Sequence, residues 1–226
     1  MRVAAIYDLH GNLPALEAVL QDIHQAEVDQ VVVGGDVVPG PMPRESLTRL
    51  LDLDIPVQFI QGNGDREVLA QMSGAEPVSV PERFREVVRW SARQLHPEHG
   101  RILAGWPAML RIEVHGLGEV LFCHATPRND TEIFTRVTPE ERLLPVFGGL
   151  DVAVIVCGHT HMQFDRVPIG SCSVPTCNCV ILPTISRKPP GASGRRRIHT
   201  RFTILRLTFS NRHRRRKSWK HSRGLS

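Results

Sequence analysis

Short apolar runs that end in glycine or a polar residue recur along this chain, and they constrain its fold more than any other feature. The clearest is VVVGGDVVPG, Val31–Gly40, which passes through two glycines to the carboxylate of Asp36. A similar run, Arg2–Tyr7, ends at Asp8 and is followed by a helical pattern. Alternation of buried strand, loop and helix predicts β-α-β crossovers and a largely parallel sheet, at least at the start of the chain.

Further helices and strands are predicted along the chain. Arg44–Leu53 predicts a second helix, and Asp54–Asn63 a third strand and loop. Pro81–Leu95 predicts an amphipathic helix. Its candidate core residues are Phe84, Val87, Val88 and Trp90. Met109–His124 is typical of a β-hairpin, and Val152–Cys157 of another buried strand.

Seven side chains that can bind a metal follow the predicted strands. Each of them alone is explained more simply as a helix cap, a turn or a surface residue. In open α/β sheets, however, ligands bind beyond the carboxyl ends of the strands, and coincidence is a poor explanation for seven such positions. The seven are Asp8, His10, Asp36, Asn63, His124, His159 and His161.

The residue types at these positions predict a metal centre. In the D-x-H and H-x-H pairs the two side chains are two residues apart, so in extended backbone they point to the same side. Carboxylate, amide and imidazole groups suit divalent Mn, Fe, Ni or Zn, and they suit a calcium cage poorly. Seven ligands are too many for one tetrahedral ion and enough for two. We therefore expect two divalent metal ions.

Five motifs in this order resemble those of the calcineurin-like metallophosphoesterases, and in particular the small YfcE-like phosphodiesterases. They are DLHGN from Asp8, GDVVPG from Gly35, GNGD from Gly62, CHATP from Cys123 and GHTH from Gly158. The resemblance covers about residues 1–170. It implies an α/β fold, a four-layer α-β-β-α sandwich, with a dinuclear metal centre at the strand ends.

The resemblance also implies a role for each motif residue. The first metal would be held by Asp8, His10 and His161, the second by Asn63, His124 and His159, and both would be bridged by Asp36. Two ions would activate a shared water for in-line attack at phosphorus and would bind a phosphoryl oxygen. Such an enzyme needs no nucleophilic side chain, and we find no sequence signature of one.

Two positions depart from the family pattern. Many members that hydrolyse phosphomonoesters have a histidine after the asparagine of the third motif, where this chain has Gly64, so a diester with a better leaving group is the expected substrate. Tyr7 replaces the usual serine, without an expected effect on catalysis. His124 and Asp65 are the predicted catalytic pair, with Asp65 accepting the free ring N–H of His124.

Two arginines are candidate substrate-binding residues. Arg66 could contact a phosphate oxygen bidentately, although an ordinary charge on a helix surface is an equally good interpretation. Arg128 lies beside Asn129 and Asp130 in a loop that is expected to overhang the centre. Either substrate selection or a polar turn explains this loop.

Charge divides the chain into two unlike parts. Of the 28 Lys and Arg residues, 14 lie in residues 171–226, which contain no Asp or Glu, while residues 1–170 contain the other 14 and all 23 acidic residues. The net charge is about −9 for the first part and about +14 for the second. We therefore predict a metallophosphoesterase domain at 1–170 and an atypical basic C-terminal segment at 171–226.

Three explanations of the basic segment stay open. Its arginine runs near Trp219 could bind RNA or DNA phosphates. It could be a disordered tail without a specific partner. It could also be an out-of-frame ending, which we favour because the composition changes abruptly near Gly170. In that case the sandwich would lack its normal closing strands.

Neither a disulfide framework nor a membrane segment is expected. The chain has five cysteines, an odd number, and two of them lie inside apolar strand-like runs. The apolar residues before Asp8 are too few for a secretory signal, and no stretch approaches membrane-spanning length. We therefore predict a cytoplasmic protein with no membrane partner and leave its oligomeric state open.

The leading hypothesis is a metal-dependent phosphodiesterase or phosphatase that acts on a phosphodiester small molecule or a nucleotide. One alternative is a non-catalytic scaffold of the same fold, against which the complete set of seven ligands argues. The other alternative is a nucleic-acid-binding protein that acts through its basic segment.

Overall fold

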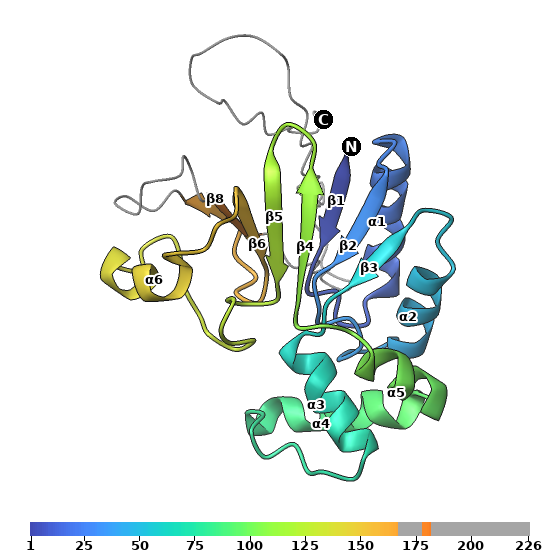
Figure 1. Ribbon diagram of the computed structural model, residues 1–226. Helices are drawn as coiled ribbons and strands as arrows, with labels where there is room; N and C mark the ends of the chain where they lie inside the picture. Colours follow the sequence, from blue (N-terminus) through green and yellow to red (C-terminus); the bar gives the residue numbers. More distant parts are fainter. Residues whose placement is uncertain (167–177, 182–226) are drawn as a thin grey trace, which may run out of the picture.

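The computed structural model describes residues 1–166 and 178–181, which form two β-sheets with helices on their outer sides (Figure 1). The first sheet is wholly parallel, in the order β1-β2-β3. Its strands are β1 (Val3–Ile6), β2 (Gln30–Val33) and β3 (Val57–Phe59). The prediction of parallel β-α-β units at the start of the chain is therefore confirmed.

The second sheet is mixed, in the order β4-β5-β6-β8-β7. Its strands are β4 (Met109–Val114), β5 (Gly118–Cys123), β6 (Val154–Cys157), β7 (Phe164–Arg166) and β8 (Asn178–Ile181). β4 and β5 form the predicted antiparallel hairpin, whereas β6 is parallel to both β5 and β8.

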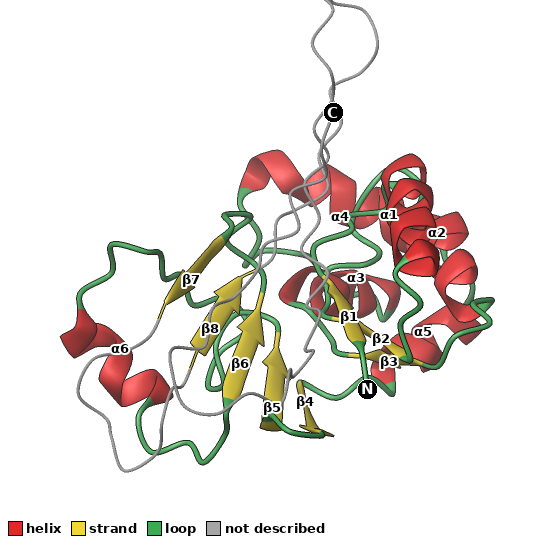
Figure 2. Ribbon diagram, turned by 90° about the horizontal axis from the view of Figure 1, so that it is seen from above, coloured by secondary structure: helices red, strands yellow, loops and turns green. Residues whose placement is uncertain are grey.

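Six helices are present in the described part of the chain. They are α1 (Leu13–Gln25), α2 (Pro43–Leu51), α3 (Asn63–Met72), α4 (Glu82–Gln94), α5 (Pro97–Ala104) and α6 (Glu140–Phe147). Asn12 caps α1, because its side chain accepts a hydrogen bond from the backbone N–H of Ala15. Helices α1 and α2 lie on one side of the paired sheets and α6 on the other (Figure 2).

The hydrophobic cores explain this layering. Side chains alternate along β1, so Ala4 and Ile6 pack in the core that contains the apolar face of α1, whereas Val3 and Ala5 pack in a second core. That second core also contains Phe122 of β5, so it lies between the two sheets. A third core joins the outer face of β5 and β6 to α6. The layers are therefore α-β-β-α, as predicted.

The prediction for the core face of α4 is largely wrong. Of its four candidate core residues only Val88 is buried, with 4% of its surface exposed, whereas Phe84, Val87 and Trp90 are 48%, 39% and 44% exposed. Ser91 is the other buried residue of this helix, and it hydrogen bonds to the backbone of Gly40. α4 therefore turns its narrow Val88–Ser91 side inward and leaves its larger apolar residues at the surface.

Two strands follow the GHTH motif. β7 and β8 pair antiparallel with each other, and β8 continues the sheet beside β6. β8 lies beyond the predicted boundary at Gly170, so the sheet is extended by residues from the segment that we separated by composition. The rest of that segment lies outside the described residues, and its proposed origins stay predictions.

None of the described helices is both long enough and apolar enough to cross a membrane. Cys123 and Cys157 are buried on neighbouring strands with their Sγ atoms 3.9 Å apart, a distance that is too long for a disulfide bond. The cytoplasmic location stays a prediction.

Candidate metal centre

The seven predicted ligands come together beyond the carboxyl ends of β1, β2, β5 and β6 and at the start of α3. Two groups are formed by the Asp and His residues among them. Within each group, one nitrogen or oxygen atom from every residue lies within 4.8 Å of the others. The groups are Asp8, His10 and His161, and Asp36, His124 and His159. The first group has the same residues as the first metal position that the resemblance implied, whereas the second contains Asp36, which we expected to bridge both positions.

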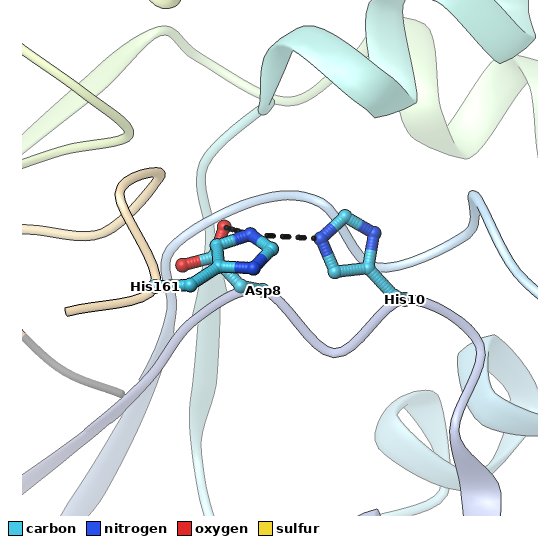
Figure 3. A group of neighbouring side chains, drawn as sticks. All are labelled: Asp8, His10 and His161. Carbon is cyan, nitrogen blue, oxygen red and sulfur yellow. Dashed lines mark hydrogen bonds and ion pairs between the residues drawn. The ribbon is translucent and has the colours of Figure 1, made fainter. Parts of the chain in front are cut away.

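The first group presents ring nitrogens toward a common point (Figure 3). The Nε2 atoms of His10 and His161 are 3.2 Å apart, and Nε2 of His161 is 3.6 Å from Oδ1 of Asp8. Nδ1 of His10 lies 3.2 Å from the carbonyl oxygen of Pro39, which can only accept a hydrogen bond. The ring proton of His10 is therefore on Nδ1, and its Nε2 lone pair faces the group.

The second group is built around His124, which is buried. Its Nδ1 donates to the carbonyl oxygen of Gly34 at 2.8 Å, so Nε2 is the ring nitrogen that faces the group. The end of the Asn63 amide lies 3.1 Å from this Nε2 and 3.0 Å from Nδ1 of His159. The Asn63 amide therefore lies beside two residues of the second group, and its role as a metal ligand stays a prediction.

Asp36 lies between the two groups. Its Oδ2 is 3.8 Å from Nε2 of His10 in the first group, and its Oδ1 is 3.5 Å from Nε2 of His124 in the second. The backbone N–H of Gly64 donates to Oδ1 at 2.7 Å and fixes the carboxylate in this orientation. The two oxygens of one side chain therefore face two different sets of donors, which is the requirement for a bridging carboxylate.

The backbone beneath these residues is not extended, contrary to our expectation for the D-x-H and H-x-H motifs. Five of the seven predicted ligands have positive φ angles, which non-glycine residues seldom adopt. The values are 54° for Asp8, 48° for His10, 54° for Asp36, 67° for His159 and 54° for His161. Tight left-handed turns therefore direct the paired side chains inward. Such conformations concentrate at functional sites, where the surrounding structure imposes them.

Asp8 shows that the first group suits a cation. Its Oδ2 accepts the backbone N–H of His159, whereas its Oδ1 is buried without a hydrogen-bond partner. Burial opposes the ionisation of Asp8, but the interactions with His161, 3.6 Å away, and with His124 and His10 outweigh it, so its pKa lies below the ordinary value. A buried carboxylate oxygen beside imidazole lone pairs is well matched to a divalent cation.

Comparison with known proteins agrees with this geometry. The family model described as the calcineurin-like phosphoesterase superfamily domain matches residues 1–212. The chain belongs to this superfamily. Its members use divalent metals, and the two groups of side chains provide donors for them.

Individual relatives support the fold of this chain. Protein MJ0912 of Methanocaldococcus jannaschii is 30% identical over 171 residues, which cover 75% of this chain and 66% of the relative. The structure of hypothetical protein PH1004 from Pyrococcus horikoshii has a TM-score of 0.69 and 17% identity, covering 81% of this chain and 77% of that one. A metallophosphoesterase from Sphaerobacter thermophilus has a TM-score of 0.60 and 25% identity, with coverages of 85% and 79%. The chain thus spans slightly less than two thirds of MJ0912.

Asp65 does not contact His124, contrary to our prediction. The ring N–H of His124 donates to the carbonyl oxygen of Gly34. Asp65 instead accepts hydrogen bonds from three backbone N–H groups. They are those of Val37 at 2.8 Å, Val38 at 3.0 Å and Gly62 at 3.1 Å. Burial, and then the charge of Asp36, raise its pKa to about 7. Asp65 therefore joins the turn that carries Asp36 to the start of α3.

The two candidate arginines are both paired with carboxylates. Arg66 donates from Nε to Oδ2 of Asp130 at 2.8 Å and from Nη2 to Oδ1 at 3.3 Å. Arg128 donates from Nε to Glu132 at 2.9 Å, within its own loop. Only Arg66 lies next to the metal-ligand groups, because the backbone carbonyl of its partner Asp130 is 3.2 Å from the Asn63 amide.

Tyr7 is a structural residue that we had not recognised. Its ring is buried against Gly34 and Gly158, where an added Cβ would overlap it, and its hydroxyl donates to the carbonyl oxygen of Val156 at 3.0 Å. Tyr7 therefore joins β1 of the first sheet to β6 of the second, directly beneath Asp8. The two glycines that leave room for it are the only sequence signal of this contact.

Proposed function

We propose that this phosphoesterase is a phosphodiesterase that works with two divalent cations, Mn, Fe, Ni or Zn. The observation that carries the proposal is the position of Asp36, whose two oxygens face separate donor groups. One cation would be held by Asp8, His10 and His161, the other by Asn63, His124 and His159, and both by Asp36. When bound, the cations would lower the pKa of a water molecule and offset the charge of a phosphoryl group.

The residues of this chain contribute orientation and proton placement. Nδ1 of His10 and of His124 faces a backbone carbonyl, so Nε2 is the nitrogen that each ring offers to a cation. Asp65 and Gly64 hold the turn and the carboxylate of Asp36 through backbone hydrogen bonds. These contacts fix the donors before a cation or substrate arrives, which reduces the reorganisation needed for the reaction.

Gly64 supports a diester rather than a monoester as the substrate. A Cβ at this position would lie 2.7 Å from Cγ of Pro39 and 2.9 Å from Oδ1 of Asp36, so the loop or the carboxylate would have to move to admit a side chain. The site therefore has no proton donor at the position that many monoesterases fill with histidine. A substrate with a leaving group that departs without protonation fits this site better.

A non-catalytic scaffold of the same fold is disfavoured by the complete and oriented set of donors. Nucleic-acid binding through the basic segment concerns residues outside the described part of the chain, and it stays a prediction.

Hydrolysis of bis(p-nitrophenyl) phosphate and p-nitrophenyl phosphate, with each of the four metals, tests the proposal. We expect metal-dependent turnover with a higher kcat/KM for the diester. Asp36→Ala should abolish this turnover, while Asp54→Ala, the same substitution at an exposed site, should leave it intact. Absence of turnover with every metal, or equal turnover by Asp36→Ala, would contradict the proposal.

A further inference from the structure

The pair formed by Asp130 and Arg66 lies beside the second donor group. Arg66 is in the first turn of α3, three residues after Asn63. Its guanidinium forms a bidentate hydrogen-bonded ion pair with the Asp130 carboxylate. The backbone carbonyl of Asp130 lies 3.2 Å from the Asn63 amide. The side chains of Arg66 and Asp130 are 46% and 33% exposed, so solvent reaches the pair.

All three guanidinium nitrogens of Arg66 already donate to carboxylates, which leaves two of its five N–H groups. Nε and Nη2 are occupied by Asp130, and Nη1 donates to Oε1 of Glu67 at 2.9 Å. Glu67 is itself held by Ser79, which donates to its other oxygen at 2.9 Å. One positive charge thus faces two carboxylates, and this cluster carries a net charge of about −1.

The carboxylate of Asp130 has no evident part in the fold of its loop. The turn is closed by backbone hydrogen bonds between Thr126 and Asn129, and the Asn129 side chain accepts the N–H of Thr131. Glu132 accepts hydrogen bonds from Thr126 and Arg128. All the contacts that the described residues make with the Asp130 carboxylate come from Arg66.

We propose that Asp130 is a specificity-determining residue that excludes dianionic phosphomonoesters by occupying and neutralising Arg66. This inference rests on the proposed phosphodiesterase function. A guanidinium fork is the preferred protein partner of a phosphate with two free oxygens, and here a carboxylate takes that place. A diester carries one negative charge at phosphorus and a monoester about two above pH 6, so the negative cluster disfavours the monoester more strongly.

The test compares Asp130→Asn with Glu132→Gln. Each variant removes one negative charge from the same loop, and each of these carboxylates pairs with an arginine. Only the partner of Asp130 lies beside the donor groups. We expect Asp130→Asn to raise the ratio of kcat/KM for p-nitrophenyl phosphate over bis(p-nitrophenyl) phosphate by about tenfold, mainly through KM of the monoester. Glu132→Gln should change the ratio by less than about twofold.

A double variant identifies the group responsible. In the double variant Asp130→Asn with Arg66→Gln, the gain in kcat/KM for the monoester should disappear, because there is no longer an arginine side chain to be released. The gain should also shrink at high ionic strength. An unchanged ratio in Asp130→Asn, an equal rise in Glu132→Gln, or a gain that persists without Arg66 would overturn the inference.

Binding separates this inference from the proposed function. Calorimetry with inorganic phosphate and dimethyl phosphate, on metal-loaded protein, measures the charge preference without turnover. We expect Asp130→Asn to strengthen phosphate binding about tenfold and dimethyl phosphate binding far less. If that shift occurs in a protein without turnover, the proposed function fails, and what stands is that Asp130 sets the charge preference of anion binding. If turnover occurs and neither the ratio nor binding shifts, the inference fails alone.

Discussion

The Nε2 atoms of His10 and His161 lie 3.2 Å apart, although 151 positions separate these residues in the chain. Since the proton of His10 is on Nδ1, at most one of the two facing nitrogens can donate a hydrogen bond. Both nitrogens belong to the first donor group, and a divalent cation bound there would be held by both rings.

Metal should therefore stabilise the fold measurably. At a free metal concentration about 100 times the Kd, stabilisation is about 2.7 kcal/mol, equivalent to roughly 5–10 °C in Tm for a chain of this size. We expect EDTA to lower Tm by this amount, and Mn²⁺ to restore it, in thermal unfolding followed by circular dichroism. His10→Ala should show a smaller shift. A Tm that is insensitive to EDTA and metal would contradict this.

Loss of Asp36 should be more damaging than loss of either neighbouring histidine. Asp36→Ala removes a group that faces both sets of donors, whereas His10→Ala and His159→Ala each remove a donor from one set. We expect Asp36→Ala to lower activity by more than roughly 10- to 100-fold, which is the loss typical of substitutions at residues that only support a metal ligand. Elemental analysis should find less bound metal per chain than in the unmodified protein. A variant that keeps two ions per chain would argue against a bridging role.

Gly64→Ala should weaken metal binding. The added Cβ would come within 2.9 Å of Oδ1 of Asp36 and 2.7 Å of Cγ of Pro39, so the carboxylate or the loop must move. Overpacking of this kind costs about 1–3 kcal/mol. Metal titration should give a lower affinity, and Gly64→His should not gain monoesterase activity. Gly74→Ala is a control for crowding, because its Cβ would meet no atom within 4 Å, although its positive φ adds strain.

Asp65→Ala should destabilise the protein strongly. The substitution leaves the backbone N–H groups of Val37, Val38 and Gly62 without their buried acceptor. Each unpaired group costs about 1–3 kcal/mol when it stays dry. Urea unfolding should show the loss, and Asp54→Ala should show almost none. A loss of activity at full stability would instead restore the catalytic role that we first assigned to Asp65.

Tyr7→Phe should reduce stability without changing turnover. The variant keeps the ring that fills the space between Gly34 and Gly158, and it loses only the hydrogen bond to Val156. We expect a loss of about 1 kcal/mol in urea unfolding. A large decrease in kcat would show that Tyr7 acts on the reaction.

Local sequence patterns predicted the positions of helices and strands better than they predicted which side chains are buried. The strands at Val3–Ile6 and Gln30–Val33 were predictable because both faces of their sheet are buried, so apolar residues run without a break. The exposure of Phe84 and Trp90 on α4 was not predictable, since an apolar helix face shows what could be buried and not which neighbour covers it.

The order of the five motifs alone determined the family, the strand ends as the place of the site, and the residue types of the metal donors. Tertiary structure alone decided which atoms face one another: Asp65 toward backbone N–H groups and not His124, Arg66 toward Asp130, and the left-handed turns beneath five of the donors. The reason is physical. A strand's burial and the turn after it depend on nearby residues, whereas the partner of a charged side chain is set by the packing of segments that are distant in the chain.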